Sequence, residues 1–198
     1  LDLFYYFKQN FWLKYPSSFF MTSWEFAKAL LTMPDRWVSY ESFDIVKSFS
    51  SDFYWQRMLN IVLHSLNSAL VYRLVLSLFN SGKTALFSCL FFALNPAAVH
   101  AVAYLVQRNI LFMLFFGLSQ CIFFLKAANA KSETGAFLLL LCSLVCFLLC
   151  KFSKEQGMMF AAMYPILTVG RLTRRTGAYN LALVPFGLWL GIRFIYDR

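Results

Sequence analysis

Long apolar segments separated by short polar loops make up most of the last three quarters of this chain of 198 residues. From residue 54 onward, six stretches consist mainly of Leu, Phe, Val, Ile and Ala, and turn-forming or charged runs such as "FNSGK", "KAANAKSETG" and "GRLTRRTG" lie between them. An α-helix needs about 20 apolar residues to cross a bilayer. The pattern predicts an all-α, polytopic transmembrane helical bundle.

The composition excludes an ordinary soluble domain. Hydrophobic residues make up 60% of the chain and charged residues 14%, and the mean hydropathy is +0.61, whereas about a quarter of the residues of a soluble protein are charged. The formal charge of +9 would suggest nucleic acid in a soluble chain, but here the basic residues lie between apolar segments. We therefore expect an integral membrane protein whose partners are membrane lipids, not nucleic acid.

The chain divides into two regions near residue 53. Residues 1–53 contain six of the nine acidic residues and no apolar run long enough to span, so we expect a membrane-hugging, extracytoplasmic loop region with short amphipathic helices, one of them over 23–31. Residues 54–198 are expected to form the transmembrane bundle. Its expected elements are six spans at about 54–80, 84–95, 107–127, 134–151, 156–170 and 178–196, and a short surface helix near 97–106.

Lysine and arginine in the short loops indicate the orientation. If the N-terminal region is outside, then Lys83, Lys126, Lys131 and the run "RLTRR" lie on the cytoplasmic side, where positive charge is favoured. The same orientation leaves three basic residues on the disfavoured side, and binding of an anion is the simplest reason for them: Arg108, Lys151 and Lys154.

A polar stripe lies along one face of the first expected span. Arg57, Asn60, His64 and Asn67 are spaced three, four and three residues apart, which places them on one helix face. Polar groups at membrane depth normally face a bundle interior or a wet cavity. The three inner residues either hydrogen-bond neighbouring helices or line a cavity, and Arg57 is expected to meet a phosphate or carboxylate at the outer interface.

The stretch "NPAAVHAVAYLVQRN" predicts a new helix after Asn95, because Asn is a good helix cap and proline fits a first helical turn. In that helix His100 and Tyr104 lie one turn apart, and Gln107 or Arg108 continues the same face. His100 is either a packed or capping residue or part of a site. Arg108 enters a hydrophobic span, which indicates a specific partner.

The run "CKFSKEQG" lies at another helix junction. It is either an ordinary solvated loop or a phosphate clamp, since ammonium groups and the N–H groups of a helix start suit a lipid phosphate. Lys154 and Glu155 are its central residues. Just before it, three cysteines recur every four residues on one helix stripe, which favours helix packing over a metal site: Cys142, Cys146 and Cys150.

Three quoted segments together resemble a known family. "LNIVLHSLNSALVYRLVLSLF", "CLFFALNPAAVHAVAYLVQRNILFMLFF" and "FSKEQGMM" are similar to the membrane module of GT-C glycosyltransferases, and most of all to the transmembrane O-mannosyltransferases with tetratricopeptide repeats and their bacterial relatives. That group has an H-x-x-N-type helix, a "P-x-x-V-x-x-V" stretch ending in arginine and an "SKE" loop in this order. The resemblance covers about residues 54–170 and implies a GT-C-like bundle.

The resemblance implies transfer of a sugar from a polyprenyl-phosphate donor to an acceptor hydroxyl, on the outer face of the bacterial inner membrane or the lumenal face of the endoplasmic reticulum; of the two, we favour the bacterial membrane. Cations, or a divalent metal ion, would neutralise the leaving phosphate, and no metal ligands are assigned. A carboxylate of the first outer loop, for which Asp2 is in the expected place, would act as base. Residues expected around the phosphate are Arg108, Lys154, Glu155 and Arg57, and residues expected to line the cavity are Asn60, His64, Asn67, His100, Tyr104 and Gln107.

The chain also departs from that family. Family members usually carry an acidic pair just after a first transmembrane helix, whereas Asp2 stands alone here and five further acidic residues before residue 53 have no motif to rank them. Tetratricopeptide repeats are absent from these 198 residues. The chain is therefore expected to be either a fragment of a longer transferase or a reduced relative. The alternative function is a non-catalytic integral membrane subunit that uses the scaffold to bind lipid and to pack against other subunits of a larger complex.

Overall fold

The structure is a computed structural model, and residues 36–49 and 52–169 are described. These residues form helices and no strand, so the predicted all-α class is confirmed. Asp2, the expected helix over 23–31 and the expected span over 178–196 lie outside the described residues. In chain order the elements are α3 (Trp37–Phe49), α4 (Phe53–Phe79), α5 (Gly82–Ala93), α6 (Pro96–Ala103), the 3-10 helix η3 (Leu105–Gln107), α7 (Arg108–Ala128), α8 (Glu133–Ser153), the 3-10 helix η4 (Glu155–Ala162) and α9 (Met163–Val169).

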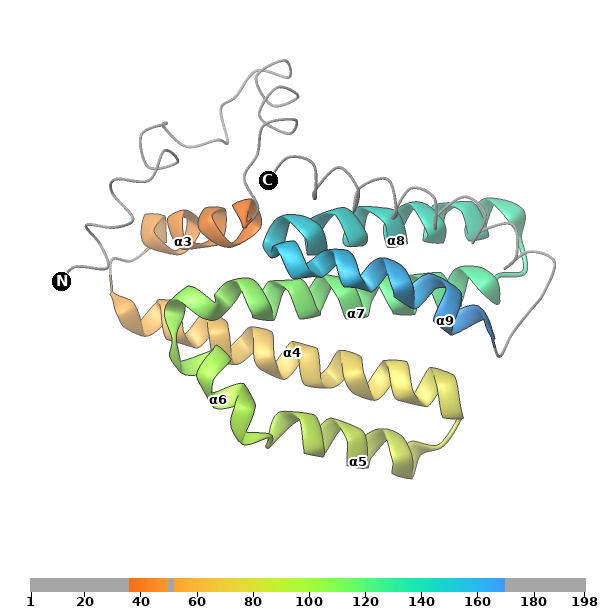
Figure 1. Ribbon diagram of the computed structural model, residues 1–198, viewed down its shortest axis with the longest axis horizontal. Coiled ribbons are helices and arrows are strands. Elements are labelled where there is room, and N and C mark those ends of the chain that lie inside the picture. The colour runs from red at the N-terminus through yellow and green to blue at the C-terminus, as the bar shows by residue number, and fades with distance from the viewer. Residues whose placement is uncertain (1–35, 50–51, 170–198) are drawn as a thin grey trace, which may run out of the picture.

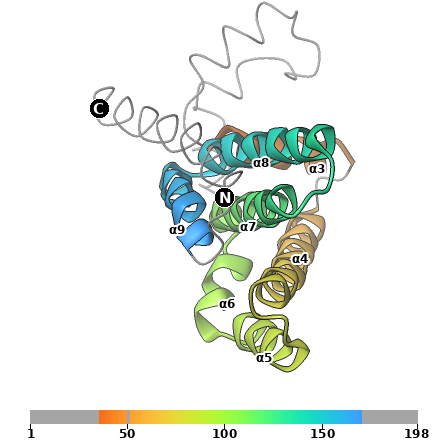
Figure 2. The same ribbon diagram turned by 90° about the vertical axis from the view of Figure 1, so that its right-hand side faces the viewer.

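The long helix α7 lies between α4 and α8; it runs parallel to α4, because α5 returns between them in the chain, and antiparallel to α8 (Figure 1). Helix α5 returns along α4, and η4 and α9 pack against α7 and α8 on the other side of the bundle (Figure 2). The short helix α3 contacts α8, α7 and α4. Because the chain reverses direction at each loop, one end of the bundle collects the starts of α4 and α7 and the end of α8.

Three helices have the length and composition of a membrane span: Phe53–Phe79, Leu105–Ala128 and Glu133–Ser153. Helix α5 has 12 residues, about 18 Å of helix, which is shorter than the hydrocarbon core. It reaches a fourth span only together with α6, across a bend of 55°. The expected span over 156–170 is instead a 3-10 helix of eight residues followed by a helix of seven. An integral membrane bundle of three or four spans is therefore what the described residues form.

Polar caps explain where the helices begin. The Asp52 carboxylate accepts from the Tyr54 N–H at 3.0 Å, and the Asn95 amide oxygen accepts from the Ala97 N–H at 3.0 Å. Proline at position 96 occupies the first turn of α6. The predicted helix start after Asn95 is confirmed.

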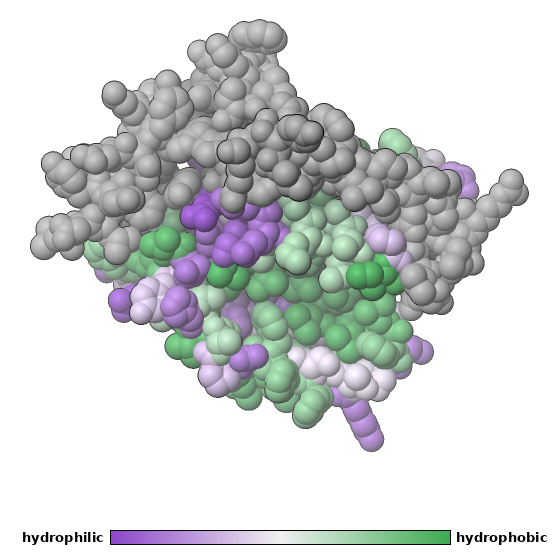
Figure 3. Space-filling view, viewed as in Figure 1, coloured by the Kyte–Doolittle hydropathy of each residue, from purple (hydrophilic) through white to green (hydrophobic). Residues whose placement is uncertain are grey.

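The outer surface is apolar. Phe87, Phe91 and Phe137 are 73%, 68% and 66% exposed, and hydrophobic residues cover much of the face in Figure 3. Soluble monomers rarely expose contiguous apolar patches of this kind. Lipid chains are the solvent that suits these side chains.

Candidate functional site

Arg108, the first residue of α7, is completely buried. Its Nε donates to the Asn60 Oδ1 at 2.8 Å, its Nη2 donates to the Gln56 Oε1 at 2.6 Å and to the Gln56 carbonyl at 2.8 Å, and its Nη1 donates to the Ser42 Oγ at 3.3 Å. The Phe43 ring lies 3.9 Å from the guanidinium carbon. This set of contacts, which we call the Arg108 hub, joins α3, α4 and α7.

The acceptors in the Arg108 hub are neutral amide, carbonyl and hydroxyl oxygens. Four of the five N–H groups of the guanidinium are directed at them, so little donor capacity is left for a ligand. A lipid phosphate would have to displace at least one of these partners to reach Arg108. The predicted role of Arg108 at a phosphate stays a prediction, and it requires that displacement.

The polar stripe of α4 hydrogen-bonds the backbones of neighbouring helices. Asn60 Nδ2 donates to the Val102 carbonyl at 3.2 Å, and Asn67 Nδ2 donates to the Leu111 carbonyl at 3.0 Å. His64 Nε2 lies 3.1 Å from the Ala93 carbonyl. A carbonyl only accepts, so His64 must carry its proton on Nε2 for this bond.

Two of these carbonyls are in places where a helix ends. Ala93 is the last residue of α5, and the N–H that would normally satisfy its carbonyl, that of Ala97, donates to Asn95 instead. Val102 lies in the last turn of α6. An unsatisfied carbonyl is costly at membrane depth, and the α4 stripe therefore allows the segment from α5 to η3 to be broken there.

His100 and Tyr104 lie on one face, as predicted. Their rings are stacked with centroids 4.4 Å apart, and both residues are exposed. Gln107 is half-buried between η3 and α7. The structure thus places His100 and Tyr104 on the surface, and the predicted cavity-lining roles of these residues stay predictions.

A second charged group, which we call the junction, lies where α8 ends and η4 begins. The Arg36 Nη2 is 3.9 Å from the Glu155 Oε1, with 41% and 29% of the two side chains exposed. Lys154 is half-buried between the two helices. Burial lowers the pKa of Lys154 below its ordinary value, the Arg36 charge lowers it further and Glu155 opposes both effects. Figure 3 shows a hydrophilic patch near this part of an otherwise largely hydrophobic face.

The junction is fixed through the backbone. The Lys154 N–H donates to the Cys150 carbonyl at 3.3 Å, and the Gly157 N–H donates to the Lys154 carbonyl at 2.8 Å. A Cβ added to Gly157 would collide with the Cys150 carbonyl. Glycine has no Cβ, so η4 can lie directly against the end of α8. This contact holds Lys154 and Glu155 at the C-terminal end of α8.

Comparison with known proteins identifies the family. The family described as dolichyl-phosphate-mannose-protein mannosyltransferase matches residues 46–192. The chain belongs to this family. No curated protein and no solved structure matches the chain significantly. The match contains α4 to α9, and with them the α4 stripe, Arg108 and two of the three junction residues.

Membership of the dolichyl-phosphate-mannose-protein mannosyltransferase family confirms the GT-C resemblance and makes the chain a GT-C-like membrane protein of glycosyltransferase type. Of the residues predicted for the site, Arg57 is exposed one turn into α4, at the end of the bundle where α8 also ends. Arg36 was missed by sequence reasoning, because nothing in its neighbourhood forms a motif. Within 36–49 and 52–169, no three His, Cys, Asp or Glu side chains are grouped so as to hold a metal ion.

Proposed function

We propose that the chain transfers a sugar from a polyprenyl-phosphate donor to an acceptor hydroxyl on the extracytoplasmic face of the membrane. The description of the family names such a donor, dolichyl phosphate mannose, and a protein as acceptor. The observation that carries the proposal is Lys154, a half-buried cation held at the end of a membrane-spanning helix beside a second cation, Arg36.

Lys154 suits a leaving phosphate. When the sugar is transferred, the bond from its C1 to the phosphate oxygen breaks and negative charge develops on that oxygen. A partly desolvated ammonium group stabilises this charge more strongly than a fully hydrated one does. Because the backbone bonds of Cys150 and Gly157 already fix Lys154, little reorganisation is needed during the reaction.

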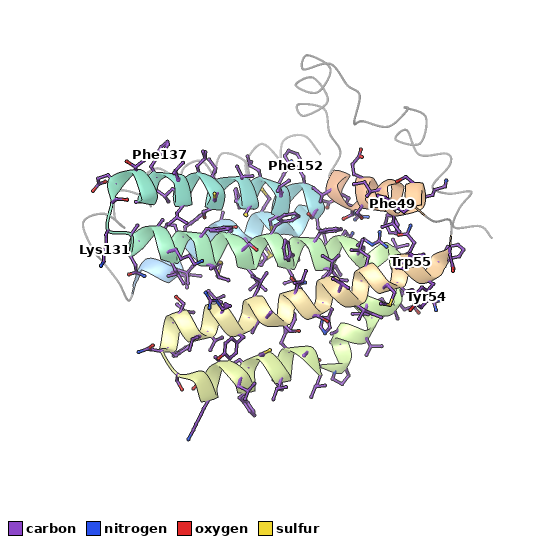
Figure 4. The ribbon with its side chains drawn as sticks, turned by 180° about the vertical axis from the view of Figure 1, so that it is seen from behind. Phe49, Tyr54, Trp55, Lys131, Phe137 and Phe152 are labelled. Atoms are coloured by element: carbon purple, nitrogen blue, oxygen red, sulfur yellow. The ribbon has the colours of Figure 1, made fainter. Side chains whose placement is uncertain are left out.

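Aromatic residues support the proposed orientation. Tyr54 and Trp55 lie at the end of the bundle where α4 begins, near Phe49 of α3, whereas Lys131 lies at the opposite end (Figure 4). The three aromatic residues are 58%, 55% and 86% exposed, as expected of an interfacial belt. A cytoplasmic position of the Lys131 end agrees with the positive-inside rule and puts the junction outside.

The acceptor hydroxyl needs a base. A carboxylate of the outer loop region, with Asp2 as the candidate, would take the proton of the hydroxyl while its oxygen attacks the sugar carbon. Glu155 cannot approach the phosphate favourably, since like charges repel, and its contribution to the phosphate site must act through the neighbouring cations.

The test uses the protein in lipid nanodiscs with dolichyl phosphate mannose as donor. Lys154→Ala should weaken donor binding about tenfold, the worth of a charge-assisted contact. Lys131→Ala, at the other end of the bundle, is the matched control and should bind as the wild type does. Equal binding by the wild type and Lys154→Ala would overturn the proposal.

The second candidate function is a non-catalytic membrane subunit, and the Arg108 hub favours it. The arginine that enters a span is used for packing three helices together rather than being presented to a ligand. Transfer of mannose to a serine- or threonine-containing peptide decides between the two. Donor binding without any transfer, in a full-length protein that retains Asp2 and the residues around it, would favour the subunit.

A further inference from the structure

Arg36 has a strained backbone. Its φ is 92°, and among the described residues the other non-glycine residue with positive φ is Asn80, at 52°. Asn80 is the left-handed cap of α4, a common place for asparagine. Arg36 is not in such a cap position. A positive φ at a residue with a long side chain costs about 1–3 kcal/mol, and this conformation persists only when its surroundings require it.

The ion pair with Glu155 is too weak to explain that strain. At 3.9 Å the pair is longer than a hydrogen bond. Both side chains are partly exposed, and pairs of this kind contribute little to stability. The strained position nevertheless brings a second cation next to Lys154, where the two positive charges repel each other; burial is the main cause of the lowered pKa of Lys154, and the Arg36 charge lowers it further.

We propose that Arg36 is a phosphate-binding residue that pairs with Glu155 while no ligand is bound. When a lipid phosphate binds at Lys154, the Arg36 guanidinium leaves the Glu155 carboxylate and binds the phosphate. This inference rests on the proposed function and names a binding residue outside the family match, which begins at residue 46. The ligand is the lipid-linked sugar of the proposed function, which carries its phosphate as a phosphodiester.

The exchange is favourable for three reasons. A guanidinium binds phosphate oxygens through two parallel hydrogen bonds, whereas its present contact with Glu155 makes none that is short enough. A phosphate between Arg36 and Lys154 also removes the repulsion between them. Glu155 keeps the Lys154 ammonium as a neighbour, so its carboxylate does not lose all positive charge nearby.

Arg36→Gly is the informative variant, because glycine adopts positive φ without strain. A residue with only a structural role would lose thermal stability on this change. We expect instead an unfolding midpoint equal to or above that of the wild type, together with about tenfold weaker binding of dolichyl phosphate mannose in nanodiscs. A lower midpoint with unchanged binding would overturn the inference.

Glu155→Gln tests the exchange directly, since it removes the competing charge and keeps the shape. Donor affinity should rise about two- to fivefold, the worth of a half-exposed ion pair. The rise should vanish in the double variant Arg36→Gly/Glu155→Gln, because no guanidinium is left to release. A fall in affinity, or the same rise in both backgrounds, would contradict the exchange.

Two further measurements distinguish the donor from ordinary anionic lipids, and the exchange from the proposed function. Nanodiscs with and without phosphatidylglycerol show whether ordinary anionic headgroups act alike; equal competition by them would assign Arg36 to bulk lipid and overturn the inference. Loss of binding in Lys154→Ala with no effect of Arg36→Gly or Glu155→Gln would leave the proposed function standing and remove the exchange. Equal binding by the wild type and Lys154→Ala would remove both.

Discussion

The Arg108 hub and the junction both place an arginine at the same end of the bundle, and they use it in opposite ways. Arg108 is completely buried, and four of its N–H groups meet neutral oxygens at 2.6–3.3 Å. The side chain of Arg36 is 41% exposed, and it pairs with the Glu155 carboxylate at 3.9 Å. The first has little donor capacity left to offer, whereas the second has most of it.

The difference shows why position near a membrane surface does not define a ligand site. A cation serves a ligand when its donors are unfilled and water or lipid can reach it, and it serves the fold when protein oxygens fill them. By that criterion the junction suits the proposed phosphate site better than the Arg108 hub does.

Arg108→Ala should lower the free energy of unfolding by about 3–5 kcal/mol, because it leaves a cavity and buried oxygens of Gln56 and Asn60 without donors. Thermal unfolding in detergent measures this loss. Arg57→Ala, an exposed arginine of the same end, is the control and should stay within about 0.5 kcal/mol of the wild type. A stable Arg108→Ala protein with impaired donor binding would move Arg108 from the fold to the site.

Asn60→Leu should cost more than Asn67→Leu, although both asparagines are completely buried on one face of α4. Asn60 accepts from Arg108 and donates to Val102, so its loss leaves two groups unpaired, at about 2–3 kcal/mol. Asn67 donates to Leu111, but its Oδ1 has no partner. Removing that unpaired oxygen offsets part of the loss, and about 1 kcal/mol is expected. Equal costs in unfolding experiments would show that the hub adds nothing to the stripe.

Gly157→Ala should destabilise the support of the junction by about 2 kcal/mol, since the new methyl group would force η4 away from Cys150. Gly82→Ala is its control, because a Cβ there meets nothing within 4 Å. The control should be neutral or stabilising by up to about 1 kcal/mol. If the Gly157→Ala protein is as stable as the Gly82→Ala protein and still binds donor normally, the junction does not depend on this close approach.

Local sequence signals predicted much of this structure. Three spans followed from apolar runs of sufficient length, and Asn95 and Pro96 were enough to predict the start of α6 and the position of His100 and Tyr104 on one face. Each of these features depends on residues within one helix or one turn. The placement of polar residues on one face of α4 is local in the same way.

Non-local features were out of reach. The partners of Arg108 come from residues 66 and 52 positions earlier in the chain, Ser42 and Gln56, and no pattern links them. Hydropathy describes the composition of 156–170 but not the 3-10 geometry that Gly157 allows there. The positive φ of Arg36 is a backbone property that no sequence motif marks.

The smallest expected effect is the response of Lys154 to pH. Burial and the Arg36 charge lower its pKa, so Lys154 loses its proton at a lower pH than an ordinary lysine does. Its attraction for phosphate should therefore decline at a lower pH than that of an ordinary lysine, whose pKa is about 10.4. Donor affinity measured from about pH 7 to about pH 10 should fall a few-fold in the wild type. Lys154→Arg should flatten the curve, because a guanidinium stays charged throughout, and Lys131→Arg should leave it unchanged. Parallel curves for the wild type and Lys154→Arg would mean that the titrating cation lies elsewhere. The junction would then differ from the Arg108 hub in structure but not in phosphate binding.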